Sequence, residues 1–179
     1  MPASSSGPHD IKAIDLMFGI PVSEDSSELY DFLKPLLMDE QSRQRFKMPA
    51  QYMFKDIPQS AGVEDKLRWT VEQMDLFGIE KAMVSYNAGR AAAMGAYWDR
   101  FLYSYEVNPN LGMEEVRKIR ELKRDHDIVA VTAFPAGLNP QVPINDKRFY
   151  PIYAECVNLG LPIFICTGIC GPRIPSLCQ

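Results

Sequence analysis

Short apolar runs alternate with helix-like segments along most of this chain, and this alternation limits the possible fold more than any other feature. The clearest run, residues 128–134, is almost wholly apolar, as expected of a strand covered on both faces in a parallel sheet. Polar turns and helical patterns separate the runs, so we expect βα units joined by right-handed crossovers. The five predicted strands lie at residues 11–21, 81–85, 102–107, 128–134 and 161–168.

Helices are predicted between these runs. In residues 64–77, Leu67, Val71 and Met74 recur at helical spacing, and Gly78 is expected to end the helix. The other predicted helices cover a segment within residues 23–46, a short Ala-rich stretch ending near residues 97–101, a basic amphipathic segment at 113–124, and residues 145–156.

The segment between the first predicted strand and the helix at 64–77 is unusually long. Pro35 is expected to kink or break the first helix. Residues 48–58 form an irregular aromatic connection, and an insertion of this length after a strand is more often a functional loop or lid than a plain linker.

Composition excludes several classes of partner. The chain has 179 residues, of which 46% are hydrophobic, and a net charge of −4, which argues against nucleic acid or an anionic membrane as the main partner. No apolar run approaches the roughly 18 residues of a membrane span. Residues 1–10 are rich in Ser, Pro and Gly, lack the apolar core of a signal peptide, and are predicted to be a disordered tail.

All four cysteines lie in the last quarter of the chain. Without a secretory signal, the expected state is reduced thiols in a cytoplasmic protein. A zinc site built from Cys166, Cys170 and Cys178 is the alternative, but their spacing is not one of the tight zinc patterns.

Three segments resemble the amidohydrolase superfamily. Ile14 and Asp15 match the start of the family's Ile-Asp-x-His-x-His first strand, residues 69–84 resemble its helix-Gly-Ile-strand unit, and residues 148–168 are close to its Arg-Phe-Tyr-Pro … Leu-Gly-Leu-Pro … His-Thr-Gly signature. The most similar branch is that of aminocarboxymuconate-semialdehyde decarboxylase and its hydrolase relatives. The resemblance implies an α/β fold in which residues 11–179 form the N-terminal portion of a TIM-type (β/α)₈ barrel, with about five parallel strands and flanking helices.

The family usually binds a divalent metal such as zinc, but the matching positions here do not carry its ligands. The two first-strand histidines correspond to Met17 and Gly19, and the histidine of the fifth strand corresponds to Cys166. The later histidine and the catalytic aspartate would lie beyond Gln179. Met17 and Cys166 offer only soft sulfur, so we expect no metal and no other cofactor. Met17 is interpreted as core packing and Cys166 as a small buried hydrophobe.

Asp15 is the candidate catalytic residue. At the C-terminal end of the first strand its carboxylate could act as a general base, or it could pair with Arg90, Arg173 or a backbone amide. His9 and His126 are the chain's two histidines. His9 lies in the tail, and His126 is expected to be a surface residue or a cation at a helix C-terminus.

Polar residues that follow the predicted strands would line the barrel mouth and could bind a carboxylate or carbonyl group. Alternatively, they are turn residues with no role beyond loop geometry. This set includes Ser85, Tyr86 and Glu106. Its principal substrate-binding candidates are Asn87, Arg90, Asn108, Thr167 and Arg173.

The resemblance implies a hydrolase or carbon–carbon lyase, such as a decarboxylase, acting on a small organic acid, here metal-free and incomplete. The alternative is a non-catalytic barrel relative, or a truncated product, that binds a ligand or a partner subunit. An open five-stranded sheet leaves two exposed edges, so we expect a homo-oligomer or a missing C-terminal half.

Overall fold

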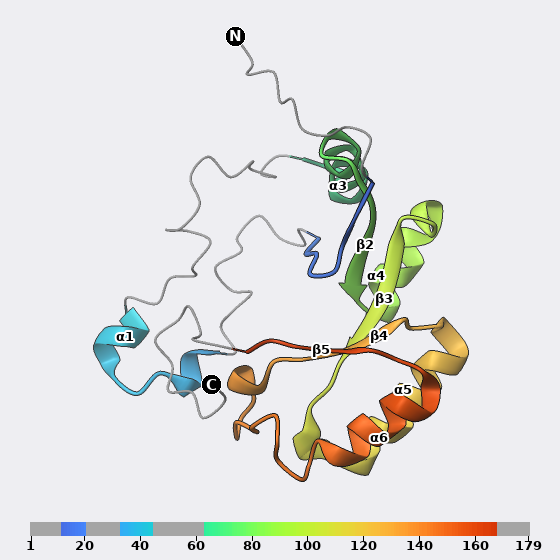
Figure 1. Cartoon of the computed structure of the whole chain (residues 1–179). Coiled ribbons are helices and arrows are strands. Elements are labelled where there is room, and N and C mark those ends of the chain that lie inside the picture. Colours follow the sequence, from blue (N-terminus) through green and yellow to red (C-terminus); the bar gives the residue numbers. More distant parts are fainter. Residues whose placement is uncertain (1–11, 21–32, 45–62, 168–179) are drawn as a thin grey trace.

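Five parallel strands form one curled sheet in this computed structural model, which describes residues 12–20, 33–44 and 63–167. The strands follow one another in the order β1-β2-β3-β4-β5, and every neighbouring pair is parallel. Such an arrangement, with helices on the outer side (Figure 1), is half of a TIM-type barrel, which confirms the predicted fold class. The strands are β1 (Ala13–Asp15), β2 (Ile79–Ser85), β3 (Phe101–Glu106), β4 (Ala130–Ala133) and β5 (Ile163–Ile165).

The helices connect the strands and begin and end at recognisable caps. The Asp65 side chain accepts a hydrogen bond of 2.9 Å from the Arg68 amide and caps the start of α3 (Lys66–Leu76). The helix ends at Leu76 and Phe77 is its C-cap; Gly78 follows with a φ of +70°, a conformation that favours glycine. The helices are α1 (Glu40–Gln44), α3 (Lys66–Leu76), α4 (Ala88–Ala93), α5 (Met113–His126) and α6 (Tyr150–Leu159), with 3₁₀ turns η2 (Met94–Tyr97), η3 (Pro109–Leu111) and η4 (Pro135–Gly137).

The core lies between the outer face of the sheet and the helices. In one cluster Ile119, Ile152 and Phe149 pack with β4 residues such as Val131. In a second cluster Met74 of α3 packs against alternate residues of the first half of the sheet, namely Ala82 and Val84 of β2 and Phe101 of β3. Burial of these apolar side chains is the main stabilising term for such a layered fold.

An ion pair between a buried glutamate and a half-exposed arginine joins α5 to α6. Arg120 Nη2 lies 2.6 Å from Glu155 Oε2, and the Glu155 side chain is only 5% exposed. The Asn158 amide donates to the other carboxylate oxygen at 3.3 Å. The hydrogen bond from Arg120 lowers the pKa of Glu155 despite its burial. Because a buried carboxylate without its partner is costly, this contact fixes how the two helices pack.

Several predicted boundaries are wrong. β1 and β5 have three residues each and are much shorter than the predicted strands. The helix expected from residue 145 begins at Tyr150, because the Asp146 side chain accepts hydrogen bonds from Arg148 and holds a turn before it. This contact with Arg148 also holds the pKa of Asp146 at about 2.

Where the structure describes the first predicted helix, the helix is interrupted around Pro35, as expected. Residues 33–36, which include Pro35, are a 3₁₀ turn, and a separate short helix, α1, follows. The Ala-rich helix α4 ends at Ala93, and the 3₁₀ turn η2 continues to Tyr97, within the predicted end at residues 97–101. The predicted tail, the first part of the helix and the connection at residues 48–58 lie outside the described residues.

The described helices are short. The longest, α5, has 14 residues and is rich in charge, whereas a bilayer-spanning helix needs about 20 apolar residues. Within the described residues, therefore, no helix has both the length and the apolar character that crossing a bilayer requires.

The first prediction concerns the packing of α6. Ile152 is fully buried and Val157, on the same helix, is 83% exposed. We expect Ile152→Ala to lower the free energy of unfolding by about 2–5 kcal/mol through lost contacts and an unfilled cavity, and the control Val157→Ala to change it by less than about 0.5 kcal/mol. Urea unfolding followed by circular dichroism measures both; equal effects would contradict the packing described here.

Candidate functional site

The register of the sheet separates the side chains of its two faces. Paired residues of neighbouring parallel strands point to the same side, and successive residues point to opposite sides. Ala82 pairs with Phe101 and Tyr105 with Val131, and these four residues belong to, or pack against, the clusters on the helix side. The intervening positions therefore face the concave side, which would be the interior of a barrel: Met83, Ser85, Leu102, Ser104, Glu106, Ala130, Thr132 and Phe164.

Three of these concave positions form a row near the C-terminal ends of β3, β4 and β5. Glu106 pairs with Thr132, and Thr132 pairs with Phe164. Neighbouring strands lie about 4.8 Å apart, so a carboxyl group, a hydroxyl group and an aromatic ring stand side by side. We call Glu106, Thr132 and Phe164 the mouth row. In TIM barrels the active site lies at this end of the strands.

Glu106 differs from most acidic residues of the described chain. Within the described residues its carboxyl group makes no hydrogen bond and no ion pair. Glu106 is exposed on the concave face, but the sheet beside it removes part of the water around the carboxyl group, and this partial desolvation raises its pKa. The result is a carboxyl group that retains its proton to a higher pH than an ordinary glutamate.

Asp15, the predicted catalytic residue, lies at the end of β1. Its Oδ1 accepts a hydrogen bond of 2.9 Å from the Met17 amide, which closes the turn after the strand. It pairs with Ala82, so its register belongs to the helix-facing set. Of the partners considered from the sequence, the structure shows a backbone amide; Arg173 and the Arg90 side chain lie outside the described part.

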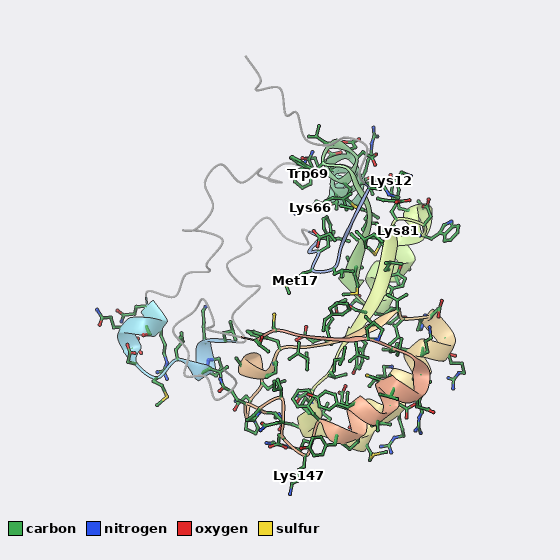
Figure 2. The ribbon with its side chains drawn as sticks, in the orientation of Figure 1. Lys12, Met17, Lys66, Trp69, Lys81 and Lys147 are labelled. Carbon is green, nitrogen blue, oxygen red and sulfur yellow. The ribbon has the colours of Figure 1, made fainter. Side chains whose placement is uncertain are left out.

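The predicted packing of Met17 and Cys166 is wrong. Met17 is 80% exposed, because the chain leaves the sheet after Asp15, and Figure 2 shows its side chain projecting from that turn. Cys166 is exposed because it follows the last residue of β5. Cys170 and Cys178 lie outside the described residues.

The residues at the family's metal positions do not fit a hard divalent ion. Met17 offers a thioether, Gly19 has no side chain, Cys166 offers a thiol, and Asp15 is engaged by a backbone amide. Zinc, manganese and magnesium sites are built mainly from imidazole and carboxylate. Across residues 12–20, 33–44 and 63–167, no three His, Cys, Asp or Glu side chains gather in a way that could hold a metal ion.

The predicted substrate-binding residues are spread around the mouth rather than gathered at one point. Asn108 caps η3, and its Oδ1 accepts from the Asn110 amide at 3.1 Å. Asn87 and Thr167 are exposed after β2 and β5, and Arg90 lies in α4.

Tyr86 was expected at the same rim but turns to the helix side. Its hydroxyl lies 2.8 Å from His126 Nε2, with ring centroids 4.4 Å apart, and its ring packs edge-on against Tyr103. His126 is the exposed last residue of α5, which confirms its predicted place at a helix C-terminus.

Sequence reasoning missed the buried Glu115 in the first turn of α5. The residue is 3% exposed and accepts hydrogen bonds from the Tyr105 hydroxyl and the Asn108 backbone amide. Its Oε2 has no partner among the described residues. Burial raises the pKa of Glu115 and outweighs these two hydrogen bonds, which lower it. Acids are common in first helical turns, but only the register of Tyr105 shows that this one is covered.

A second polar link fixes the mouth loops. Arg148 Nη1 donates to Asn110 Oδ1 at 2.7 Å, and the Asn110 amide donates to the Pro140 carbonyl at 2.9 Å. Since Asn110 follows β3 and the other two residues follow β4, the loops on either side of the mouth row are held together.

A cavity of about 460 Å³ lies at the opposite end of the sheet, where β2 and β3 begin. Lys12, Lys81 and Arg100 line part of it, and Figure 2 labels the two lysines. Arg100 is already paired with Asp75 at 2.8 Å and donates to two backbone carbonyls. The cavity lies at the N-terminal ends of the strands, which in TIM barrels contribute to stability, whereas catalytic residues lie at the C-terminal ends.

Comparison with known proteins supports the fold. No family model matches the chain, and neither does any curated protein sequence. An uncharacterised TIM-barrel protein from Bordetella bronchiseptica aligns with 93% of this chain and 58% of its own, at 24% identity and a TM-score of 0.57. A 5-carboxyvanillate decarboxylase from Novosphingobium aromaticivorans, solved with manganese and 3-methoxy-4-hydroxy-5-nitrobenzoic acid, aligns with 92% of this chain and 53% of its own, at 16% identity and a TM-score of 0.57.

The present chain thus spans little more than half the length of these two structures. At these identities the likeness establishes a shared TIM-barrel fold, one that hosts many unrelated activities.

The second prediction concerns Glu115. Its folded-state pKa is raised, so the folded protein binds the proton more tightly than the unfolded chain, and stability falls as pH rises from about 4.5 through the raised value. We expect Glu115→Gln to flatten this decline, because the amide keeps an acceptor for Tyr105 without the charge. Urea unfolding between pH 4 and pH 8 gives the two profiles. Parallel profiles would mean that Glu115 does not titrate abnormally.

Proposed function

We propose that this chain is part of an amidohydrolase-like barrel that acts on a small organic acid, as a hydrolase or a decarboxylase, without a divalent metal. The shared fold with a decarboxylase suggests the reaction class by analogy. The observation that carries the proposal is the mouth row, which places unpaired polar groups on the concave face at the catalytic end of the strands.

The donor set at the mouth favours metal-free chemistry. A thioether, a glycine and a thiol stand where the family has histidines, so the polarising charge must come from other groups. Arginines bind carboxylates through two parallel hydrogen bonds, and Arg90 and Arg173 are our candidates for this role, with Asn87, Asn108 and Thr167 as hydrogen-bonding partners.

Asp15 is the proposed general base. Its Oδ1 is occupied by the Met17 amide, which leaves the second carboxylate oxygen to accept a proton. A base must also lie within hydrogen-bond reach of the proton it removes. Substrate binding at the strand ends would therefore have to bring the reacting group to the turn after β1.

The third prediction tests the metal-free reaction. We expect turnover of an aromatic acid such as 5-carboxyvanillate, followed by absorbance, to be unchanged after dialysis against a chelator and after addition of manganese. A decarboxylase that uses a metal would lose turnover on chelation and regain it with manganese, and this result would contradict the proposal.

The fourth prediction concerns Asp15. Asp15→Asn keeps the hydrogen bond from the Met17 amide but removes the base, so we expect kcat to fall at least about 100-fold with little change in KM. Asp125→Asn, at the far end of α5, is the matched control and should leave kcat unchanged. Equal kcat values for all three proteins would show that Asp15 is not the base.

A second candidate function is pairing with another subunit. Within the described residues, β1 and β5 each have a neighbouring strand on one side only. Unpaired strand edges attract further strands, so a second copy of the chain could cover them. Sedimentation at several concentrations tests this: concentration-dependent association supports pairing, and a monomer at all concentrations contradicts it.

A further inference from the structure

We infer that the mouth row is a metal-free recognition site for a ligand carboxylate, in which the Glu106 carboxylic acid donates a hydrogen bond to the ligand and Phe164 supports its apolar body. This inference rests on the proposed function and names how the acid is recognised. It assigns Glu106 as a specificity-determining residue.

The geometry comes from the strand register. Glu106, Thr132 and Phe164 are successive partners across β3, β4 and β5, so they lie in line on the concave face. Two strand spacings separate Glu106 from Phe164, roughly 10 Å. That length matches a carboxylate attached to one flat ring, with the carboxylate at Glu106 and the ring beside Phe164.

The polar members of the row have no competing partners in the described chain. Neither the Glu106 carboxyl group nor the Thr132 hydroxyl makes a hydrogen bond there, in contrast to Ser104, whose Oγ is 3.4 Å from the Val84 carbonyl. Phe164 is 37% exposed, because β5 has a neighbouring strand on one side only within the described residues, and its ring surface is open to a ligand. A row with two unpaired donors and an exposed ring is suited to an acid with an apolar body.

The charges around Glu106 favour its protonated form. Desolvation is the cause of its raised pKa, and no neighbouring charge contributes to the shift. Among the described residues of the same face, the titratable ones are Lys81, near the start of β2, and Cys166, just after β5, while Ser85 and Thr132 carry no charge. Glu115 and Tyr105 lie on the helix side of β3.

Protonation decides whether such a row attracts or repels an acid. A carboxylic acid that donates to a carboxylate forms a strong charge-assisted hydrogen bond, and the Thr132 hydroxyl can donate a second one. Once Glu106 loses its proton, two like charges face each other and binding is lost. No arginine or metal ion is required for this recognition.

Binding of 4-methoxybenzoate to the full 179-residue chain tests the inference by calorimetry between about pH 5.5 and pH 8, where the probe keeps one fixed charge. We expect the wild-type Kd to rise about tenfold per pH unit above the Glu106 pKa. Glu106→Gln should bind with a Kd that does not depend on pH, because its amide donates at every pH. Thr132→Val should weaken binding several-fold, and the control Glu114→Gln should behave as the wild type.

Two results would overturn the inference, and only the second would also overturn the proposed function. If Glu106→Gln binds the probe with the wild-type pH dependence, the mouth row does not recognise the carboxylate, while the proposed function stands. If wild-type protein binds no 4-methoxybenzoate at any pH and turns over no aromatic acid, both fall.

A measurement without ligand tests the protonation of Glu106 independently of the binding assay. Because the folded-state pKa of Glu106 is raised, wild-type stability should fall as pH rises from about 4.5, and Glu106→Gln should remove that part of the decline. Unfolding curves whose pH dependence is identical for the two proteins would show that Glu106 holds no extra proton, and would overturn the inference without any ligand.

Discussion

The continuous parallel ladder is the constraint on which the rest of this structure depends. Each strand pairs with the next one in the sequence, and the register is maintained from β2 to β5 without interruption. Because side chains alternate with a period of two, one register assigns every residue of these strands to a face. A slip of one residue in β3 would exchange Glu106 with Tyr105 and would place the carboxyl group among the helices.

The same alternation places one carboxyl group on each side of β3, and the two groups have opposite roles. On the helix side, Tyr105 donates to Glu115, and this pair joins the strand to the first turn of α5. On the concave side, the Glu106 carboxyl group has no hydrogen-bond or ion-pair partner in the described chain, although Glu106 directly follows Tyr105 in the sequence. The first arrangement stabilises the loop that follows the strand, and the link between Arg148 and Asn110 holds the neighbouring loop to it. The second leaves a proton donor available to a ligand.

Hydrophobic periodicity and Gly or Pro signals are local, and they predicted the alternating strands and most of the helices. The family resemblance added the partial barrel as the fold class. The local signals failed where a side chain competes with the backbone: Asp146 holds a turn with Arg148 and delays α6, and Asp15 closes a turn that ends β1 early. Met17 was interpreted as core because methionine is usually buried, but it stands past the end of a short strand. The mouth row joins residues 26 and 32 positions apart, and only the ladder register reveals it.

The proposed chemistry depends on which side chains stand at the positions that the sequence resemblance aligns with metal-binding histidines. A divalent metal polarises a carboxylate through a fixed positive charge that does not depend on proton uptake near neutral pH. A desolvated carboxylic acid instead offers one hydrogen-bond donor, and its strength as a binding group depends on pH because the group itself titrates. In the proposed metal-free site, the power of a cation would be exchanged for selectivity between protonation states. Since Glu106 owes its raised pKa to desolvation alone, any change that admits water to the mouth would weaken this recognition without touching the residue itself.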